Sequence, residues 1–283
     1  MNISVVTCIF NQRADYFREC AASVAALGAS IRWIIVDDGS SDEHHSTYLN
    51  IVDEAGLTRI TKIVRLIDNV GLAAARNIAL DYVADGWVIV LDSDDKIGES
   101  VGRILSGIDT SIELVAFSSH YFDATMFEYR PITRWEKMFF SHGKTVGDPF
   151  LWYDFYYHGI VAKTKVLKQI GGYRVDLRVG EDQDILLRTT ELLPRNAVAF
   201  VDEIGYQYRR NAYGVCATSW SIVEKNYITT MLEAAHRRGA LFKACRFAGR
   251  ELIDNAWIEK FEYQLPNDEW VDWTQYSGLY LSN

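Results

Sequence analysis

The chain lacks most of the features that would place it outside the ordinary reduced, globular proteins. Its four cysteines, Cys8, Cys20, Cys216 and Cys245, have neither C-x-x-C nor metal-ligand spacing, so we expect reduced thiols. No apolar run approaches the roughly 18 residues that a membrane span needs. The first residues also lack the charged and hydrophobic regions of a signal peptide. These absences predict a cytoplasmic protein.

Basic residues are also in short supply. The chain has 29 lysines and arginines against 38 acidic residues, which gives a net charge of -9. Because no long basic run offsets this charge, the composition argues against broad affinity for nucleic-acid backbones. The G-x-G-x-x-G turn of dinucleotide-dependent oxidoreductases is missing as well. An anionic ligand would therefore need a bound cation or a local basic pocket.

The first hundred residues show the alternation of strand and helix patterns that is typical of βαβ units and a mostly parallel sheet. The expected strands are Ile3 to Phe10, Ile31 to Val36, Ile60 to Leu66 and Trp87 to Leu91. The expected helices lie between them, at Asp15 to Leu27, Asp42 to Ala55 and Gly71 to Val83. The pattern predicts an α/β fold with a Rossmann-like sheet flanked by helices.

Polar residues collect where these four strands end. Asn11 and Gln12 follow the first strand, Asp37-Asp38-Gly39-Ser40-Ser41-Asp42 the second, Asp68-Asn69 the third and Asp92-Ser93-Asp94-Asp95 the fourth. Ligands bind at the carboxyl ends of the strands in such sheets. We therefore expect a binding site at this edge.

The acidic turn after Leu91 is the most informative of these segments. Its carboxylates could cap a helix over Lys96 to Leu105, where the helix dipole favours negative charge. Three carboxylates within four residues repel one another, however, and a divalent cation would relieve that repulsion. Metal binding is the favoured interpretation, with Asp95 left as a helix cap.

Three further segments have an ordinary structural interpretation beside a functional one. Asp38 could accept hydrogen bonds from a base or ribose, or its segment could be a turn in which Asp42 caps the next helix. Arg76, in a helix opened by Gly71, could face a ligand or solvent. Glu181-Asp182 begins another helix, where the carboxylates could cap it or Asp182 could act as a general base.

The second half is less regular. Strands are expected at Ile112 to Phe122, Gly159 to Lys163, Ala197 to Val201 and Tyr206 to Arg209, with helices at Thr164 to Ile170 and Glu181 to Leu193. The tail from Ser221 to Phe261 is expected to be helical. We predict one domain over residues 1–218, divided at residue 98 into a nucleotide-binding and an acceptor half, and a helical extension over residues 219–283.

Together and in this order, the segments resemble the inverting nucleotide-sugar glycosyltransferases of family 2, which have the GT-A fold. The resemblance spans roughly residues 2 to 215. It rests on VVTCIFNQ, WIIVDDGSSD, NVGLAAARNIAL, WVIVLDSDD, IGGYRVDLRVGEDQDILLR and YQYRR. One departure is Cys8, which stands in the first loop where the family often has proline.

The resemblance implies a role for each matching position. Asp182 would be the catalytic base, and Asp94, the last residue of the family's DxD motif, would hold Mn²⁺ or Mg²⁺ between two phosphates. The residues implied in nucleotide binding are Thr7, Phe10, Asn11, Asp38, Asn69, Arg76, Asp92, Ser93 and Arg209, although either Arg209 or Arg210 could face the diphosphate. A UDP-sugar is the expected donor, and an acceptor hydroxyl would receive the sugar.

The acceptor side gives weaker signals. Aromatic residues that could stack on a sugar or an aglycone, or belong to the core, are Trp135, Trp152, Tyr153, Phe155, Tyr156 and Tyr157, with Trp270, Trp273 and Tyr276 further on. The expected C-terminal helix carries basic residues, Arg237, Arg238, Lys243, Arg246 and Arg250. They suggest either peripheral contact with anionic lipid near a lipid-linked acceptor, or a solvated or self-associating face.

Two other classes use the same fold. A nucleotidyltransferase usually has a glycine-rich loop after the first strand, whereas Thr7 to Arg13 has no glycine. A sugar-nucleotide-binding protein without catalysis is disfavoured because both Asp94 and Asp182 are present. A glycosyltransferase in glycan or glycoconjugate biosynthesis is therefore the leading prediction.

Overall fold

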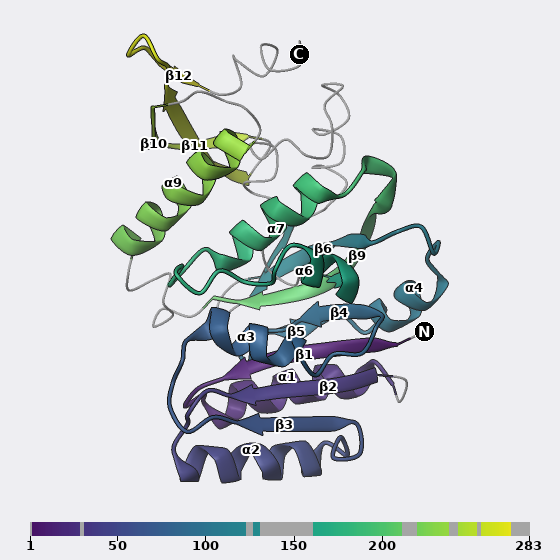
Figure 1. Ribbon diagram of the computed structural model, residues 1–283. Coiled ribbons are helices and arrows are strands. Elements are labelled where there is room, and N and C mark those ends of the chain that lie inside the picture. Colours follow the sequence, from purple (N-terminus) through teal and green to yellow (C-terminus); the bar gives the residue numbers. More distant parts are fainter. Residues whose placement is uncertain are drawn as a thin grey trace.

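A computed structural model of the chain describes seven segments, residues 2–28, 31–122, 127–130, 161–210, 220–237, 243–253 and 256–272 (Figure 1). The aromatic residues between Trp135 and Tyr157, with Trp273 and Tyr276, lie outside these segments, and so does Arg238. Within them, no helix combines the length and the apolar character that crossing a membrane requires.

The first half of the chain has the predicted order of elements. Four strands, β1 (Ile3–Ile9), β2 (Ile31–Asp37), β3 (Thr61–Arg65) and β4 (Trp87–Val90), alternate with three helices, α1 (Ala14–Ala26), α2 (Asp42–Glu54) and α3 (Leu72–Leu80). Their boundaries differ from the predicted ones by a few residues at most. β2 pairs in parallel with both β1 and β3, and β1 pairs in parallel with β4, so their carboxyl ends share one edge.

The second half extends the same sheet. Its elements are β5 (Lys96–Ile97), α4 (Val101–Gly107), β6 (Leu114–Phe122), β7 (Phe127–Arg130), β8 (Val161–Lys163), α6 (Thr164–Gln169), α7 (Glu181–Leu192) and β9 (Val198–Arg209). The strand order is β3-β2-β1-β4-β8-β6-β9-β5, with β7 beside β6. β1 to β4, β6 and β9 run in one direction, and β5, β7 and β8 run against them. The mostly parallel sheet was predicted.

The hydrophobic core has two parts, one on each face of the sheet. Trp33, Phe17 and Tyr48 bury their rings together on the face that α1 and α2 cover. Alanines of α3 and leucines of α7, such as Ala75 and Leu186, pack against the other face. Both faces are apolar because most side chains of β1, β2 and β4 are hydrophobic and buried, as expected of strands covered on both sides.

The C-terminal region corrects the predicted helical extension. Helix α9 (Trp220–Arg237) is present, but β10 (Ala244–Ile253), β11 (Ala256–Gln264) and β12 (Trp270–Asp272) form a three-stranded antiparallel sheet. The predicted basic helix face is therefore wrong. Arg246 lies opposite Glu262 in the β10–β11 ladder, and its Nε is 2.7 Å from a Glu262 carboxylate oxygen. A cross-strand ion pair explains the basic residue better than a membrane-facing helix does.

The tight turn after β2 depends on Gly39. Its φ is +80°, and a Cβ there would lie 2.7 Å from the backbone N of Asn69 and from the backbone carbon of Asp68. We predict that Gly39→Ala separates the loops that follow β2 and β3 and lowers the melting temperature. Gly56→Ala is the matched control, since Gly56 has a similar φ of +71° but open space around it. Equal melting temperatures for the two variants would contradict the proposed loop contact.

Candidate active site

The loops at the carboxyl ends of β1 and β2 are joined through Asn11. Its backbone N–H donates to Ser40 Oγ at 2.9 Å, and its side-chain oxygen accepts from the Ser41 N–H at 3.0 Å. Asn11 has a φ of 44°, a conformation that asparagine tolerates better than most residues. The arrangement holds the two loops side by side at the sheet edge and leaves the neighbouring Phe10 ring half exposed.

Asp38 connects this edge to the start of α3. Its two carboxylate oxygens accept from the N–H groups of Val70, at 2.7 Å, and Gly71, at 3.0 Å. Asn69 donates to the Asp38 backbone oxygen at 3.1 Å. Asp37, not Asp38, accepts from Ser40 N–H inside the turn itself. The cap of α2 is Ser41 rather than the predicted Asp42.

Arg76 is the centre of the site. It is 4% exposed, and its guanidinium donates to Asp92 and to Glu181, both at 2.6 Å. The ring of Tyr173 lies 5.3 Å from the guanidinium carbon. Burial alone would lower the pKa of Arg76, but the two carboxylates raise it well above its usual value. Arg76 therefore faces the strand edge, not solvent, and brings two distant acidic motifs together.

The acidic turn, residues 92–95, is held by contacts with the loop after β1 and with β9. Gln12 donates to Ser93 Oγ at 3.0 Å, and the Asp92 N–H donates to the Tyr206 hydroxyl at 3.2 Å. Asp94 is partly exposed, and burial together with the nearby Asp92 charge raises its pKa to about 6. A cation bound beside the Asp94 carboxylate would stabilise its negative charge against both effects.

Asp95 is not the predicted helix cap. Its side chain is buried and accepts from the Tyr206 hydroxyl and from the Arg209 N–H, both at 2.6 Å. The residues that follow it form β5, and α4 begins only at Val101. Burial and the adjacent carboxylates raise the pKa of Asp95 well above its usual value. Asp95 fastens the acidic turn to β9.

Arg209 lies against the same turn. Its Nε donates to the Asp94 backbone oxygen at 2.8 Å, and its Nη2 is 2.9 Å from a Glu19 carboxylate oxygen. The guanidinium carbon is also 4.2 Å from the centre of the Tyr16 ring. Of the two arginines that the sequence left open, Arg209 is thus placed beside the acidic turn, while Arg210 is exposed at the end of β9.

Asp182 lies in the first turn of α7, next to Glu181. The Gln183 N–H donates to its carboxylate at 2.8 Å. Burial raises the pKa of Asp182 to about 8, with the negative charge of Glu181 as the next cause. A carboxyl group with a pKa near neutrality can take up a proton during a reaction, which suits a general base.

Two predicted nucleotide-binding positions differ sharply in exposure. Thr7 is fully buried, and its hydroxyl accepts from the Trp33 indole N–H at 3.0 Å. Phe10, in contrast, is 50% exposed beside Asn11, where an aromatic ring could stack on a base. The side chain of Thr7 is thus engaged in the core in this structure, while that of Phe10 is available.

The described segments contain no group of three or more His, Cys, Asp or Glu side chains arranged to hold a metal ion. A magnesium-type site does not need such a group, because Mg²⁺ is usually held by one or two carboxylates together with substrate phosphates. The charge pattern of the turn fits this type. The Asp94 contact with Arg209 uses its backbone oxygen, so its carboxylate remains available for a cation.

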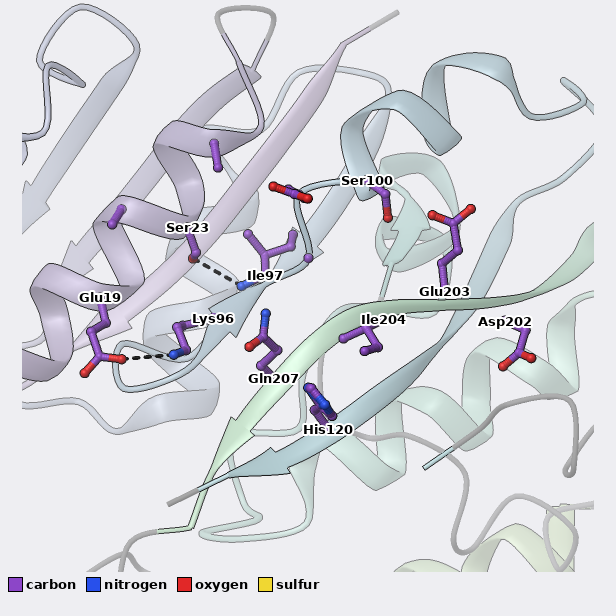
Figure 2. Close-up of a pocket in the computed structure, with 14 residues that line it drawn as sticks. Glu19, Ser23, Lys96, Ile97, Ser100, His120, Asp202, Glu203, Ile204 and Gln207 are labelled. Carbon is purple, nitrogen blue, oxygen red and sulfur yellow. Dashed lines mark hydrogen bonds and ion pairs between the residues drawn. The ribbon is translucent and has the colours of Figure 1, made fainter. Parts of the chain in front are cut away.

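A cavity of about 700 Å³ lies between α1 and β9 and is also lined by β5 (Figure 2). Its lining includes Glu19, Lys96, His120 and Gln207, but not Asp92, Asp94 or Asp182. Lys96 is 3.0 Å from Glu19, and Ser23 accepts from the Ile97 N–H (Figure 2). This cavity is therefore separate from the residues that carry the predicted chemistry.

Three contacts were not predicted from the sequence: Glu181 with Arg76, Tyr173 with Arg76, and Gln12 with Ser93. Each contact joins residues more than 80 positions apart, which local sequence patterns do not reveal. The acidic pair that opens α7 was the one usable signal for Glu181. The predicted residues Asp38, Asn69, Arg76, Asp92, Ser93 and Arg209 do lie along one edge of the sheet.

Comparison with known families settles the class of the protein. The family model described as Glycosyl transferase family 2 matches residues 4–171, more than half of the chain. The chain belongs to this family. The matched range includes the acidic turn and the Arg76 helix but ends before Asp182.

Curated relatives agree with this family. One is an uncharacterized glycosyltransferase from Haemophilus influenzae, 30% identical over 95 residues, which are 34% of this chain and 37% of the relative. Another is an undecaprenyl-phosphate 4-deoxy-4-formamido-L-arabinose transferase from Enterobacter sp., 26% identical over 151 residues, which are 52% of this chain and 46% of the relative. The match thus spans less than half the length of either relative.

Solved structures identify the fold. S. aureus TarS 1-349 in complex with UDP-GlcNAc superposes with a TM-score of 0.62 at 14% identity, covering 95% of this chain and 99% of that one. The mannosyltransferase PcManGT from Pyrobaculum calidifontis, in complex with GDP-Man and Mn²⁺, has a TM-score of 0.61 at 14% identity and covers 83% of this chain and 64% of that one. These are GT-A glycosyltransferases, and the chain shares their fold.

Proposed function

We propose that this glycosyltransferase is metal-dependent and inverting, and that it moves a sugar from a nucleoside-diphosphate sugar to an acceptor hydroxyl in glycan or glycoconjugate biosynthesis. The observation that carries the proposal is the pair of ion contacts from Arg76, which join Asp92 of the acidic turn to Glu181 beside Asp182. A diphosphate-binding motif and a carboxyl group with a pKa of about 8 thereby share one site.

In the proposed reaction, the acceptor oxygen attacks the anomeric carbon of the donor as the bond to the nucleoside diphosphate breaks. The diphosphate leaves with the bonding electrons from the opposite face, so the configuration inverts. Asp182 takes the proton of the attacking hydroxyl. Asp94 would hold Mn²⁺ or Mg²⁺, which supplies charge neutralisation for the diphosphate when bound, and Asp92 would lie on the ribose side. Arg209 keeps the Asp94 backbone in place.

UDP is the favoured nucleotide. TarS was solved in complex with UDP and with UDP-GlcNAc, and UDP-sugars are the commonest donors implied by the family resemblance. Phe10 and Asn11 would line the base pocket, with Phe10 stacked on the base. Asp38 and Arg76 would contact the nucleoside, and Asn69 would support that contact. Peripheral contact with a membrane and a lipid-linked acceptor remain part of the proposal, supported by the named relative that acts on undecaprenyl phosphate.

The metal role of Asp94 can be tested through nucleotide binding. We predict that wild-type protein binds a nucleoside diphosphate at least about tenfold more tightly with Mn²⁺ than with EDTA, because the cation offsets the charge of both partners. Asp94→Ala should remove this difference. Isothermal titration calorimetry provides the measurement, and Asp109→Ala, on an exposed loop, is the control. A metal effect that persists in Asp94→Ala would assign the cation to another residue.

Donor turnover separates the proposed function from its two alternatives. A glycosyltransferase releases nucleoside diphosphate from a sugar nucleotide, either to water or to an acceptor. A nucleotidyltransferase would instead release pyrophosphate from a nucleoside triphosphate, and a non-catalytic binding protein would release neither. Detection of nucleoside diphosphate supports the proposal, whereas pyrophosphate release alone would overturn it.

A further inference from the structure

We propose that helix α9 is a positioning element for the catalytic carboxylate. Its polar side chains fix the turn that carries Asp182, so that α9 sets the rate of sugar transfer without touching the donor. This inference rests on the proposed function, because it assigns α9 a role in the same reaction. The residues concerned are 220–237 of α9 and the segment 173–184, which runs from Tyr173 into the first turn of α7.

The position of the Asp182 carboxylate is fixed by the backbone of its own helical turn. The hydrogen bond that the structure gives this side chain comes from the adjacent Gln183 N–H, within the same turn. Gly180 precedes the helix with a φ of +82° and bends the chain into α7. Whatever holds residues 179 to 184 therefore holds the reacting oxygen.

Helix α9 binds this segment on both sides of Asp182. Asn226 donates from its side chain to the Val179 carbonyl at 2.9 Å. Thr230 donates to Gln183 Oε1, also at 2.9 Å. Thr230 is fully buried and Gln183 is 2% exposed, so water cannot replace this bond if it is lost.

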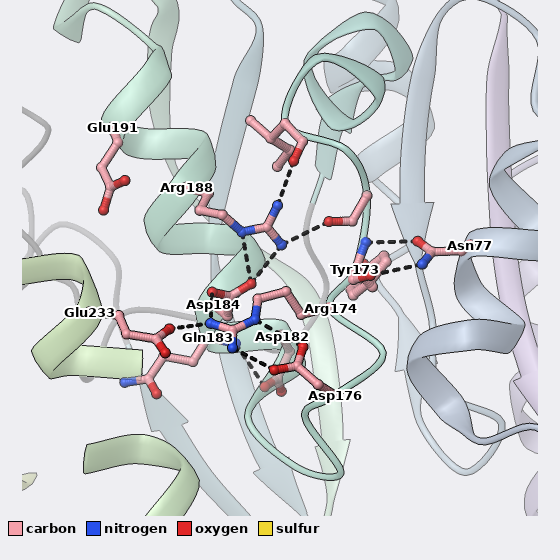
Figure 3. Close-up of polar contacts among 12 residues, drawn as sticks. Asn77, Tyr173, Arg174, Asp176, Asp182, Gln183, Asp184, Arg188, Glu191 and Glu233 are labelled. Atoms are coloured by element: carbon pink, nitrogen blue, oxygen red, sulfur yellow. Dashed lines mark hydrogen bonds and ion pairs between the residues drawn. The ribbon is translucent and has the colours of Figure 1, made fainter. Parts of the chain in front are cut away.

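A charged cluster adds a third connection (Figure 3). The Arg174 guanidinium contacts Glu233 of α9, lies 2.6 Å from Asp176 and is 3.7 Å from the buried Asp184 carboxylate. Arg188, one turn further along α7, is 2.6 Å from Asp184. Asp184 has no exposed surface, so these arginines are its ion-pair partners in place of water, and Arg174 links it directly to α9.

The opposite side of the same segment is held by α3. Asn77 donates to the Tyr173 carbonyl and accepts from its N–H, at 2.8 and 2.7 Å (Figure 3). Its neighbour Arg76 binds Glu181. The segment 173–184 is thus bound on one side by α3 and on the other side by α9. A variant that loses the α9 contacts should keep the α3 contacts, those of Arg76 with Glu181 and of Asn77 with Tyr173.

The test is Thr230→Val, which removes one hydroxyl without changing the size of the side chain. We expect kcat for sugar transfer to fall by about tenfold or more, because a small displacement of a reacting group is costly. The donor KM and the affinity for nucleoside diphosphate should stay within about twofold of wild type. Thr230→Ser restores the hydroxyl and should restore kcat.

Thr229→Val is the matched control. It makes the same change one residue earlier in α9, where the hydroxyl donates to the Lys225 carbonyl of the helix itself. If Thr230→Val lowers kcat no more than Thr229→Val does, the inference is wrong even though wild-type transfer supports the proposed function. If wild-type protein transfers no sugar, both proposals fail.

A second pair of variants applies if Thr230→Val does not fold. Asn226→Ala breaks the bond to Val179, while Arg237→Gln breaks another α7–α9 contact, the ion pair with Glu191 at the far end of α7. The inference predicts a fall in kcat for Asn226→Ala and an unchanged kcat for Arg237→Gln. Equal effects would show that α9 supports α7 in general and does not position Asp182.

Discussion

Asp182→Asn should abolish sugar transfer while leaving nucleotide binding intact. The amide has nearly the same shape as the carboxylate but cannot accept the acceptor's proton, and loss of a general base typically costs about 100-fold or more in rate. Stopped transfer assays with purified protein measure the rate, and calorimetry with nucleoside diphosphate and Mn²⁺ measures binding. The side chain contacts its own turn through Gln183 N–H, so the amide oxygen can keep that bond.

Asp81→Asn is the control for this substitution. It makes the same chemical change at an exposed position directly after α3 and should leave both rate and binding unchanged. An Asp182→Asn enzyme with near-normal turnover would remove Asp182 as the base. In that case the neighbouring Glu181 would be the next carboxylate to test.

The pH dependence of the wild-type enzyme gives a second readout of the same residue. Burial first, and then the charge of Glu181, raise the pKa of Asp182 to about 8. A base must be deprotonated to act, so kcat/KM should rise with pH and level off above about pH 8. The kcat/KM profile reports the free enzyme, so an activity that does not rise between about pH 6 and 8 would contradict this assignment.

Arg76→Met should have the largest effect on stability. The substitution keeps the volume of the buried stem but leaves Asp92 and Glu181 without their shared positive charge. Breaking a buried ion pair from one side typically costs about 3 kcal/mol or more, and Glu181 here is almost fully buried. We therefore expect a lower free energy of unfolding in urea, together with loss of nucleotide binding.

Two further variants separate charge from packing at this position. Arg76→Met combined with Glu181→Gln removes one of the unpaired carboxylates and should recover part of the lost stability without recovering activity. Arg13→Met, which breaks an exposed ion pair with Asp15, should leave the unfolding midpoint unchanged. Full stability in Arg76→Met alone would show that the Arg76 contacts add little to the fold.

The sequence predicted the fold of the first hundred residues well because its signals are local. β1, β2 and β4 consist mostly of buried apolar residues, and each is followed by polar residues whose common edge is dictated by parallel pairing. The sequence placed Arg76 on α3 but could not predict the direction of its side chain. That direction depends on Glu181, which lies 105 residues away. The nucleotide, metal and base roles of the edge residues stay predictions.

The sequence misled where long-range pairing decides the structure. Asp95 follows two other acidic residues and suggests a cap, yet its partners Tyr206 and Arg209 come from β9. The basic residues after Arg237 suggested a helix face, yet Arg246 pairs with Glu262 across a hairpin. The Pro266-Asn267-Asp268 turn between β11 and β12 was a usable signal for strands. The predicted division at residues 98 and 218 stays a prediction.

The measurement that tests the account most directly is the thermal shift of wild-type protein with a panel of nucleoside diphosphates, each with Mn²⁺ and with EDTA. A ligand that binds only the folded state raises the melting temperature, and the rise grows with the logarithm of its concentration relative to its Kd. The account predicts a rise with one base, UDP in first place, that requires Mn²⁺. No rise with any nucleoside diphosphate in the presence of Mn²⁺ would contradict a donor site at the edge that Arg76, Asp92 and Asp94 form.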